Sequence, residues 1–286
     1  SPAGFGSAAL VERASRWLRD WARSPDGRPF FLFVDLWDVH PEFLARRAEA
    51  AQPGAPAADR ERVVGLYDTA VHHMDAQLGR LVHTLRQLGV LDRTIVAVTS
   101  DRGTELFERG GLAPGQTLYD EALLVPLVLS YPGVVAPGRV IEAQARLVDL
   151  APTLLSLSSI PRPSSFGSGP GALHGEQSFA SWLGYVPLQS PPPDLVALSQ
   201  TLLATPPLDS VRRPDGKALI PGGKREFRRY YDLTADPGET LDLVTQDLSA
   251  GSDLVGMWTQ WQVYLASRRE LDHHLERARS VRERGS

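Results

Sequence analysis

The sequence contains no cysteine, which excludes disulfide bonds, thiolate metal ligands and a cysteine nucleophile. Lysine is nearly as scarce, because Lys217 and Lys224 are its only occurrences and the other basic residues are arginines. No apolar run approaches the roughly 20 residues that a membrane-spanning helix requires. The chain begins at Ser1 without a signal-peptide pattern. We therefore expect no membrane span, and the cellular compartment is not readable from the sequence.

Charge of one sign is not in excess either. Thirty Lys and Arg residues stand against thirty-four Asp and Glu residues, which gives a formal net charge of −4. A general nucleic-acid binder needs a concentrated positive face, so this balance argues against that class. The 286 residues, of which 42% are hydrophobic, suffice for one large globular domain or two ordinary ones.

Hydrophobic periodicity predicts an α/β fold in the first half of the chain. Apolar residues at steps of three and four predict one amphipathic helix over Ala8–Trp21 and a longer one from Val63 to Leu88. Short apolar runs predict buried strands, the first of them apolar on both faces as in a parallel sheet. These runs are Phe30–Val34, Thr94–Thr99 and Val125–Leu129. Together they predict a strand–helix–strand unit of a parallel or mixed sheet.

The composition changes after Ile160. We predict an α/β core over 1–160, a Pro/Ser/Gly-rich loop or linker over 161–193, and a C-terminal subdomain over 194–286. In this subdomain, short antiparallel strands are expected around a hairpin turn at Pro214–Lys217, followed by a helix from about Asp253. Asp149 is predicted to cap a further helix in the core.

Two polar segments follow predicted strands, where open α/β sheets bind their ligands. Asp38-Val39-His40-Pro41 follows the first strand, and Thr99-Ser100-Asp101-Arg102-Gly103 follows the second. We expect both to open onto one edge of the sheet, with Asp101 placed to hold a cation. A simple loop histidine at His40 and a turn carboxylate at Asp101 are the alternative interpretations. Glu105 is expected to be solvated.

Several stretches, taken in order, resemble blocks of the sulfatase family of the alkaline-phosphatase superfamily. They cover about Phe30–Val244 and read RPFFLFVDLWDVHPEF, YDTAVHHMDAQLGRLVHTLRQLGVLDRTIVAVTSDRG, TLYDEALLVPLVLSYPG, LVDLAPTLLSLSSIP and YYDLTADPGETLDLV. The resemblance implies an alkaline-phosphatase-like mixed sheet sandwiched by helices, plus a small C-terminal antiparallel sheet with a helix.

The resemblance also implies a chemistry. Family members hydrolyse sulfuric esters, some relatives act on phosphoric esters, and both use a divalent cation, usually calcium. Their nucleophile is a formylglycine made from the Cys or Ser of a C-x-P-S-R motif. By this resemblance His40 matches the histidine that contacts the substrate, and Asp101 matches a metal-binding aspartate. The implied ligand is a small anionic ester or sulfate.

The chain departs from the family at several positions. Nothing before Phe30 matches the nucleophile motif or its preceding Asp-Asp ligands, so no formylglycine is possible in this chain. Arg102 stands where the family has His or Asn, and a guanidinium has no lone pair with which to bind a cation. Pro114 stands where a further family histidine is common.

These departures leave two hypotheses open. In the first, the chain is the C-terminal two-thirds of a sulfatase-type hydrolase, inactive as it stands because its catalytic N-terminal part is absent. In the second, it is a non-catalytic binding or interaction module with a degenerate, metal-free site, in which Arg102 pairs with Asp101 and replaces the cation. The sequence does not reveal the substrate or the oligomeric state.

Overall fold

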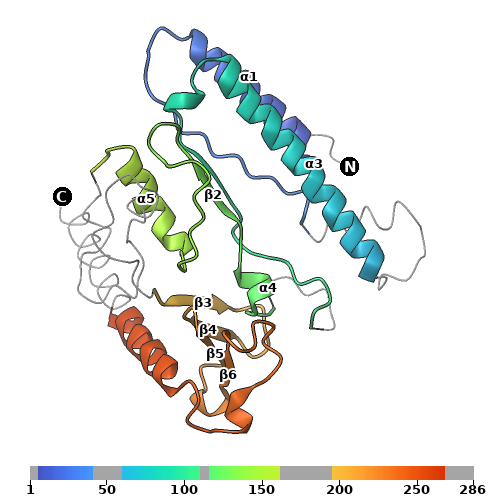
Figure 1. Cartoon of the computed structure of the whole chain (residues 1–286), viewed down its shortest axis with the longest axis vertical. Coiled ribbons are helices and arrows are strands. Elements are labelled where there is room, and N and C mark those ends of the chain that lie inside the picture. Colours follow the sequence, from blue (N-terminus) through green and yellow to red (C-terminus); the bar gives the residue numbers. More distant parts are fainter. Residues whose placement is uncertain (1–5, 41–59, 110–115, 162–194, 268–286) are drawn as a thin grey trace, which may run out of the picture. The chain divides into compact units, whose positions relative to one another are not determined.

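The computed structural model describes residues 6–40, 60–109, 116–161 and 195–267 (Figure 1). The chain forms two compact units that interleave along the sequence. The first unit contains residues 1–99, 104–114 and 126–138, and the second contains the remainder. The predicted linker over 161–193 lies almost entirely outside the described residues, and Pro114 lies outside them too. Within the described residues, no helix is long and apolar enough to cross a bilayer.

Two helices dominate the first unit, and both confirm the predicted periodicity. Helix α1 (Ser7–Arg23) lies beside the longer α3 (Arg60–Gln87). Gly89 follows the end of α3, and its φ of +67° suits a residue without a Cβ. The N–H of Val90 then donates to the carbonyl of Leu85 at 3.1 Å, which satisfies one of the last carbonyls of the helix.

The first unit also contains a small sheet. A short 3-10 turn, η1 (Leu91–Arg93), leads into β1 (Val96–Thr99), which pairs antiparallel with β2 (Leu127–Ser130). The core joins both helices to this sheet through buried and partly buried apolar side chains. They are Leu18, Trp21, Phe30, Leu32, Leu81, Leu85, Leu88, Val90, Leu91 and Val96.

The prediction of a buried strand over Phe30–Val34 is wrong for the described structure. The segment forms no strand there, and its side chains alternate between the core and solvent. Phe30 packs edge-on against Trp21 at 4.7 Å, whereas Phe31 and Phe33 are 82% and 79% exposed. A strand requires a hydrogen-bonded neighbour as well as apolar residues. The predicted parallel pairing is therefore not seen, and the sheet that forms in this unit is antiparallel.

The second unit contains the antiparallel sheet that was predicted for the C-terminal part of the chain. Its sheet has the order β3 (Ala197–Thr201), β4 (Leu208–Arg212), β5 (Gly216–Pro221) and β6 (Arg229–Asp232). Strands β4 and β5 join through the predicted turn, in which the Arg213 N–H donates to the Gly216 carbonyl at 2.8 Å. The 3-10 turns η3 (Arg225–Phe227) and η4 (Leu243–Thr245) flank β6.

The last described helix, over residues 252–267, packs its apolar face on this sheet. Leu254 and Trp258 belong to one core cluster with Val211 and Ile220, and partly buried Trp261 packs against this cluster. The indole N–H of Trp258 also donates to buried Asp209 at 2.9 Å. The tryptophan face of this helix therefore covers its own sheet.

Two shorter helices complete the second unit. They are α4 (Asp120–Leu123) and α5 (Leu150–Leu157), the latter preceded by η2 (Leu147–Asp149). Asp149 takes the predicted N-cap position of α5, but its carboxylate makes no capping hydrogen bond to the helix N-terminus. Fully buried Asp149 instead accepts from the Arg146 guanidinium at 2.7 Å, and Arg146 also donates to the Val196 carbonyl. A guanidinium suits a fully buried carboxylate, because its parallel N–H groups can donate to both carboxylate oxygens.

Candidate functional site

His40 closes a turn in the first unit. Its N–H donates to the Trp37 carbonyl at 2.9 Å, and the two rings lie 5.0 Å apart at 30°. Asp38 is buried and accepts from the N–H of Ser7 at 2.9 Å, at the first residue of α1. An anion at a helix N-terminus satisfies an otherwise unpaired donor and the helix dipole. Asp38 therefore anchors the turn, and the ring of His40 is half-buried against Trp37.

Asp101 lies on a turn in the second unit, directly after the end of β1. Its side chain is exposed. The Ser100 hydroxyl donates to the Arg102 carbonyl at 2.6 Å and so fixes the backbone on both sides of Asp101. Arg102 is half-buried, and neither it nor Asp101 has an ion pair with any residue that the structure describes. The predicted pairing of Arg102 with Asp101 is therefore not formed.

Gly103 holds this turn against α4. Its N–H donates to the Ala122 carbonyl at 2.9 Å. A Cβ at position 103 would lie 2.1 Å from the carbonyl oxygen of Glu121, a distance that no side chain tolerates. The glycine of the Asp-Arg-Gly motif is thus required by a close approach of two backbones. The position of Asp101 consequently depends on the position of α4.

The other predicted site positions have mixed outcomes. Pro114 lies outside the described residues, so its place in the site stays a prediction. Glu105 is buried, which makes the prediction of a solvated loop residue wrong. His40 and Asp101 belong to different units, so their meeting at one edge of a sheet stays a prediction.

The described residues do not by themselves make a calcium site. Calcium takes six to eight oxygen ligands. In the described part of the chain, no group of three or more His, Asp or Glu side chains lies close enough to hold a metal ion. Asp101 offers one carboxylate, and the neighbouring Arg102 adds positive charge rather than a ligand.

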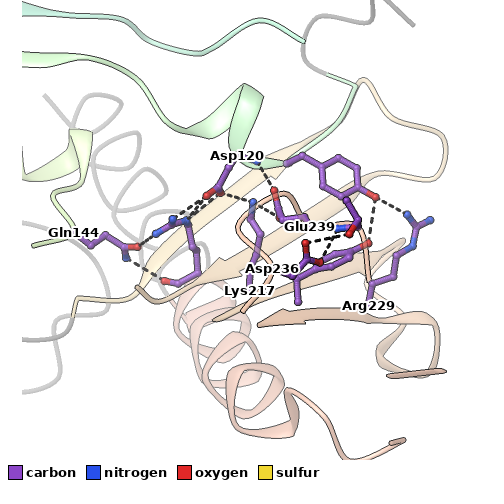
Figure 2. A network of polar contacts seen from close by, with 10 residues as sticks. Asp120, Gln144, Lys217, Arg229, Asp236 and Glu239 are labelled. Carbon is purple, nitrogen blue, oxygen red and sulfur yellow. Dashed lines mark hydrogen bonds and ion pairs between the residues drawn. The ribbon is translucent and has the colours of Figure 1, made fainter. Parts of the chain in front are cut away.

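A cluster of buried charges that the sequence analysis did not find lies at the start of α4 (Figure 2). The ammonium of Lys217, on β5, is fully buried and lies 2.6 Å from Asp120 Oδ1 and 2.7 Å from Glu239 Oε1. The second oxygen of Glu239 accepts from the backbone N–H of Asp120 at 2.7 Å. Each charge therefore has an opposite charge within hydrogen-bonding distance, as burial requires.

A second cation completes the cluster from β4. The guanidinium of Arg212 donates to Asp120 Oδ2 at 2.8 Å and to Oδ1 at 3.0 Å. Gln144 accepts from the same guanidinium, and its amide donates to the Arg212 carbonyl at 3.1 Å. Asp120 thus accepts from both cations, and we call Asp120, Gln144, Arg212, Lys217 and Glu239 the α4 cluster.

The loop that carries Glu239 is itself shaped by hydrogen bonds. Asp236 accepts from the N–H groups of Thr240 and Leu241 at 2.7 and 2.8 Å. Glu239 has a φ of +52°, a conformation that disfavours residues with a Cβ. The fully formed loop and the ion pair with Lys217 hold Glu239 in this conformation.

Burial and charge act in opposite directions on the carboxylates of the α4 cluster. Burial raises the pKa of Asp120, but the hydrogen bonds and charges of Arg212 and Lys217 outweigh it, and the net pKa is lowered. Burial also raises the pKa of Glu239, and here it exceeds the opposing effect of Lys217, so the net pKa is raised. As the pH falls, Glu239 therefore takes up a proton before Asp120 does.

A pair of tyrosines lies beside the cluster. The hydroxyls of Tyr119 and Tyr231 are 3.3 Å apart, and Arg229 donates to the Tyr119 oxygen at 2.9 Å. Burial raises the pKa of Tyr231, so this hydroxyl stays protonated at neutral pH.

The α4 cluster is a buried network of ion pairs and hydrogen bonds. Its acidic members accept from nearby donors, and its amine is fully buried. It ties α4 to the C-terminal sheet, and α4 contacts the Asp101 turn through Gly103. The sequence contained one signal, since Asp120 and Glu239 lie in the stretches TLYDE and DPGE that resemble family blocks. Which partners they contact is a tertiary property that these stretches do not encode.

Comparison with known proteins agrees with this architecture. The Sulfatase family model matches residues 5–160. Arylsulfatase K of Bos taurus is 29% identical over 257 residues, which cover 85% of this chain and 44% of that protein. Arylsulfatase A of Homo sapiens is 33% identical over 145 residues, which cover 48% of this chain and 26% of that protein. The chain thus spans less than half the length of these relatives.

Solved structures with the same fold include a phosphonate monoester hydrolase and a protein bound to a disulfated glucosamine. The phosphonate monoester hydrolase of Agrobacterium radiobacter matches with a TM-score of 0.67 at 20% identity, over 91% of this chain and 60% of that chain. A protein solved with its substrate D-glucosamine-2-N,6-O-disulfate matches with a TM-score of 0.60 at 23% identity, over 77% and 46% of the two chains. These likenesses show the alkaline-phosphatase-like fold, with helices and antiparallel sheets. Because the family model covers more than half of its residues, the chain belongs to the sulfatase family.

Proposed function

We propose that the protein to which this chain belongs hydrolyses sulfuric esters, with water and the ester giving an alcohol and sulfate. The observation that carries the proposal is the match of the Sulfatase model to residues 5–160, which include both the His40 turn and the Asp101 turn. Steryl-sulfatase and arylsulfatases among the relatives support the reaction class. The fold match to a phosphonate monoester hydrolase supports esters of phosphorus acids, among them phosphoric esters, as further candidate substrates.

The residues of this chain have limited roles in that reaction. His40 is proposed to contact the ester, because its ring is oriented by Trp37 and its turn is anchored by Asp38. Asp101 is proposed to contribute one carboxylate to the cation site of the family, usually a calcium site. A cation held there would neutralise the charge of the transferring sulfate group.

We further propose that these 286 residues alone do not turn over an ester. They contain no Cys and no Ser-x-Pro-Ser-Arg string from which a nucleophile could be made. Removing the nucleophile of a hydrolase lowers its rate by up to about six orders of magnitude. With 4-methylumbelliferyl sulfate or the corresponding phosphate, the isolated chain should therefore release no fluorophore above the rate in buffer. Turnover that Asp101→Asn and His40→Ala both abolish would contradict this proposal.

The second candidate is a metal-free module that binds an anion without hydrolysing it, which Arg102 favours. Its guanidinium is half-buried beside Asp101, on a turn fixed by Ser100 and Gly103. Calorimetric titration with calcium and with sodium sulfate separates the candidates. Calcium binding that Asp101→Asn removes, and that the exposed control Asp92→Asn retains, supports the hydrolase. Sulfate binding that Arg102→Gln removes and Arg102→Lys retains supports the metal-free module.

A further inference from the structure

A cavity of about 400 Å³ lies between α1 and α3 in the first unit. This volume falls within the range of small-ligand pockets. Residues from both helices line it, and none of them is His40, Asp101, Arg102 or Pro114. We call it the α1–α3 cavity. Because regular helices form its walls, the side chains around it start from fixed positions.

Polar side chains contribute to the wall of this cavity where the helices meet. Ser15 on α1 and Gln77 and Thr84 on α3 are 3%, 4% and 5% exposed, and all three line the cavity. The Thr84 hydroxyl donates to the Arg80 carbonyl at 3.0 Å and lies 3.3 Å from the Ser15 hydroxyl. Packed helices usually meet through apolar residues, so these three buried polar groups along the helix interface offer hydrogen bonds rather than an apolar surface.

The ionisable side chains that line the cavity carry an excess of hydrogen-bond donors. Arg19, Arg80 and His83 stand against one carboxylate, Glu12. Glu12 is only loosely engaged, with its oxygen 3.8 Å from the Arg19 guanidinium in an exposed pair. Arg80 uses one of its five N–H donors within the described residues, to Gln77 Oε1 at 3.3 Å. Most guanidinium donors at this cavity therefore remain available to a ligand.

We propose that the α1–α3 cavity binds a small oxyanion that carries two or more negative charges. Two arginines from the two helices would contact its charged oxygens, and the Gln77 amide and the Ser15 hydroxyl would donate to the remaining oxygens. A metal cation does not fit, since only one carboxylate lines the cavity. The chain has a net charge of −4, so any anion affinity must come from a local group of cations rather than from overall charge.

Calorimetric titration of the full chain with sodium sulfate, sodium phosphate and sodium citrate, at constant ionic strength, tests the proposal. We expect a dissociation constant below about 1 mM for at least one of them, and the preferred probe distinguishes inorganic from carboxylate anions. Arg80→Gln should weaken binding at least about tenfold, the loss of one charge-assisted contact. Arg86→Gln, an exposed arginine on the same helix outside the cavity lining, should change it less than about twofold.

A second measurement avoids reliance on the variants. In a wild-type NMR titration, the side-chain signals of His83 and Gln77 should shift with the same midpoint as the calorimetric binding. The proposal is overturned by an absence of binding up to about 10 mM anion, by equal losses in Arg80→Gln and Arg86→Gln, or by shifts confined to residues outside the cavity. These outcomes do not depend on ester hydrolysis, so this proposal and the proposed function fail separately.

Discussion

Replacing Lys217 by methionine tests the α4 cluster directly. The substitution keeps the length and apolar stem of the side chain and removes its charge. Asp120 keeps its contacts with Arg212, but Glu239 loses the ammonium 2.7 Å away and keeps the N–H of Asp120 as a donor. A buried carboxylate thereby loses its countercharge, while the packing volume changes little.

The expected cost follows from the burial of these groups. Removing one partner of a buried ion pair destabilises a protein by about 3–5 kcal/mol, because the remaining charge stays desolvated. Since Asp120 retains a cation and Glu239 retains a hydrogen bond, we expect a loss of about 3 kcal/mol at pH 7. Urea denaturation followed by far-UV circular dichroism measures this difference. Lys224→Met, at the exposed second lysine, is the matched control and should change stability by less than about 0.5 kcal/mol.

The loss should also depend on pH. A carboxyl group whose pKa is raised by folding destabilises the fold above that pKa, and the penalty disappears as pH falls below it. The pKa of Glu239 is already raised by burial, and removing Lys217 takes away the charge that opposed the rise. The difference between wild type and Lys217→Met should therefore narrow by about 1 kcal/mol or more between pH 7 and pH 5. A loss below about 1 kcal/mol at pH 7 would refute the reasoning, as would a larger loss that does not vary with pH.

Three further outcomes are expected from the same structure. Gly103→Ala should destabilise the chain by about 2 kcal/mol or more in urea denaturation, because the new Cβ would clash with the backbone of α4. The control Gly65→Ala, in open space on α3, should stabilise the chain by about 0.5–1 kcal/mol. Equal effects of the two substitutions would contradict the clash. Arg146→Met should cost about 3–5 kcal/mol by leaving buried Asp149 without its guanidinium, and a loss under about 1 kcal/mol would argue against that pair. In a carbon-detected NMR titration, the carboxyl of Glu239 should show a midpoint above 4.5, whereas a midpoint at or below 4.5 would contradict its burial.

Local sequence patterns were sufficient to predict the helices and the C-terminal sheet. The apolar steps along α3 and the Pro214-Asp215 turn are encoded within a few neighbouring residues, and both elements form as predicted. Phe30–Val34 shows the limit of such patterns. An apolar run indicates that its side chains can be buried. A strand also needs a hydrogen-bonded neighbouring strand, and the run does not indicate whether one is present.

The candidate site, too, could be predicted from the sequence only in part. The motif containing Asp101 was visible, and the structure explains its glycine by the close approach to α4. The α4 cluster was not visible, because Asp120, Lys217 and Glu239 are separated by up to 119 positions and meet only in the folded chain. Charged residues are usually solvated, so sequence alone favours exposure at each of these positions. The same expectation made the prediction for Glu105 wrong.

The scarcity of lysine limits where lysine-directed reagents can act on the folded chain. Lys217 is fully buried and Lys224 is exposed, and the sequence contains no other lysine side chain. An acylating reagent or a lysine-specific protease acting on the native chain would therefore meet one accessible lysine side chain, just after the end of β5. Modification or cleavage at Lys217 would require the α4 cluster to open first. The ratio of reaction at the two positions would thus report how often this part of the fold opens, without a mutation or a denaturant.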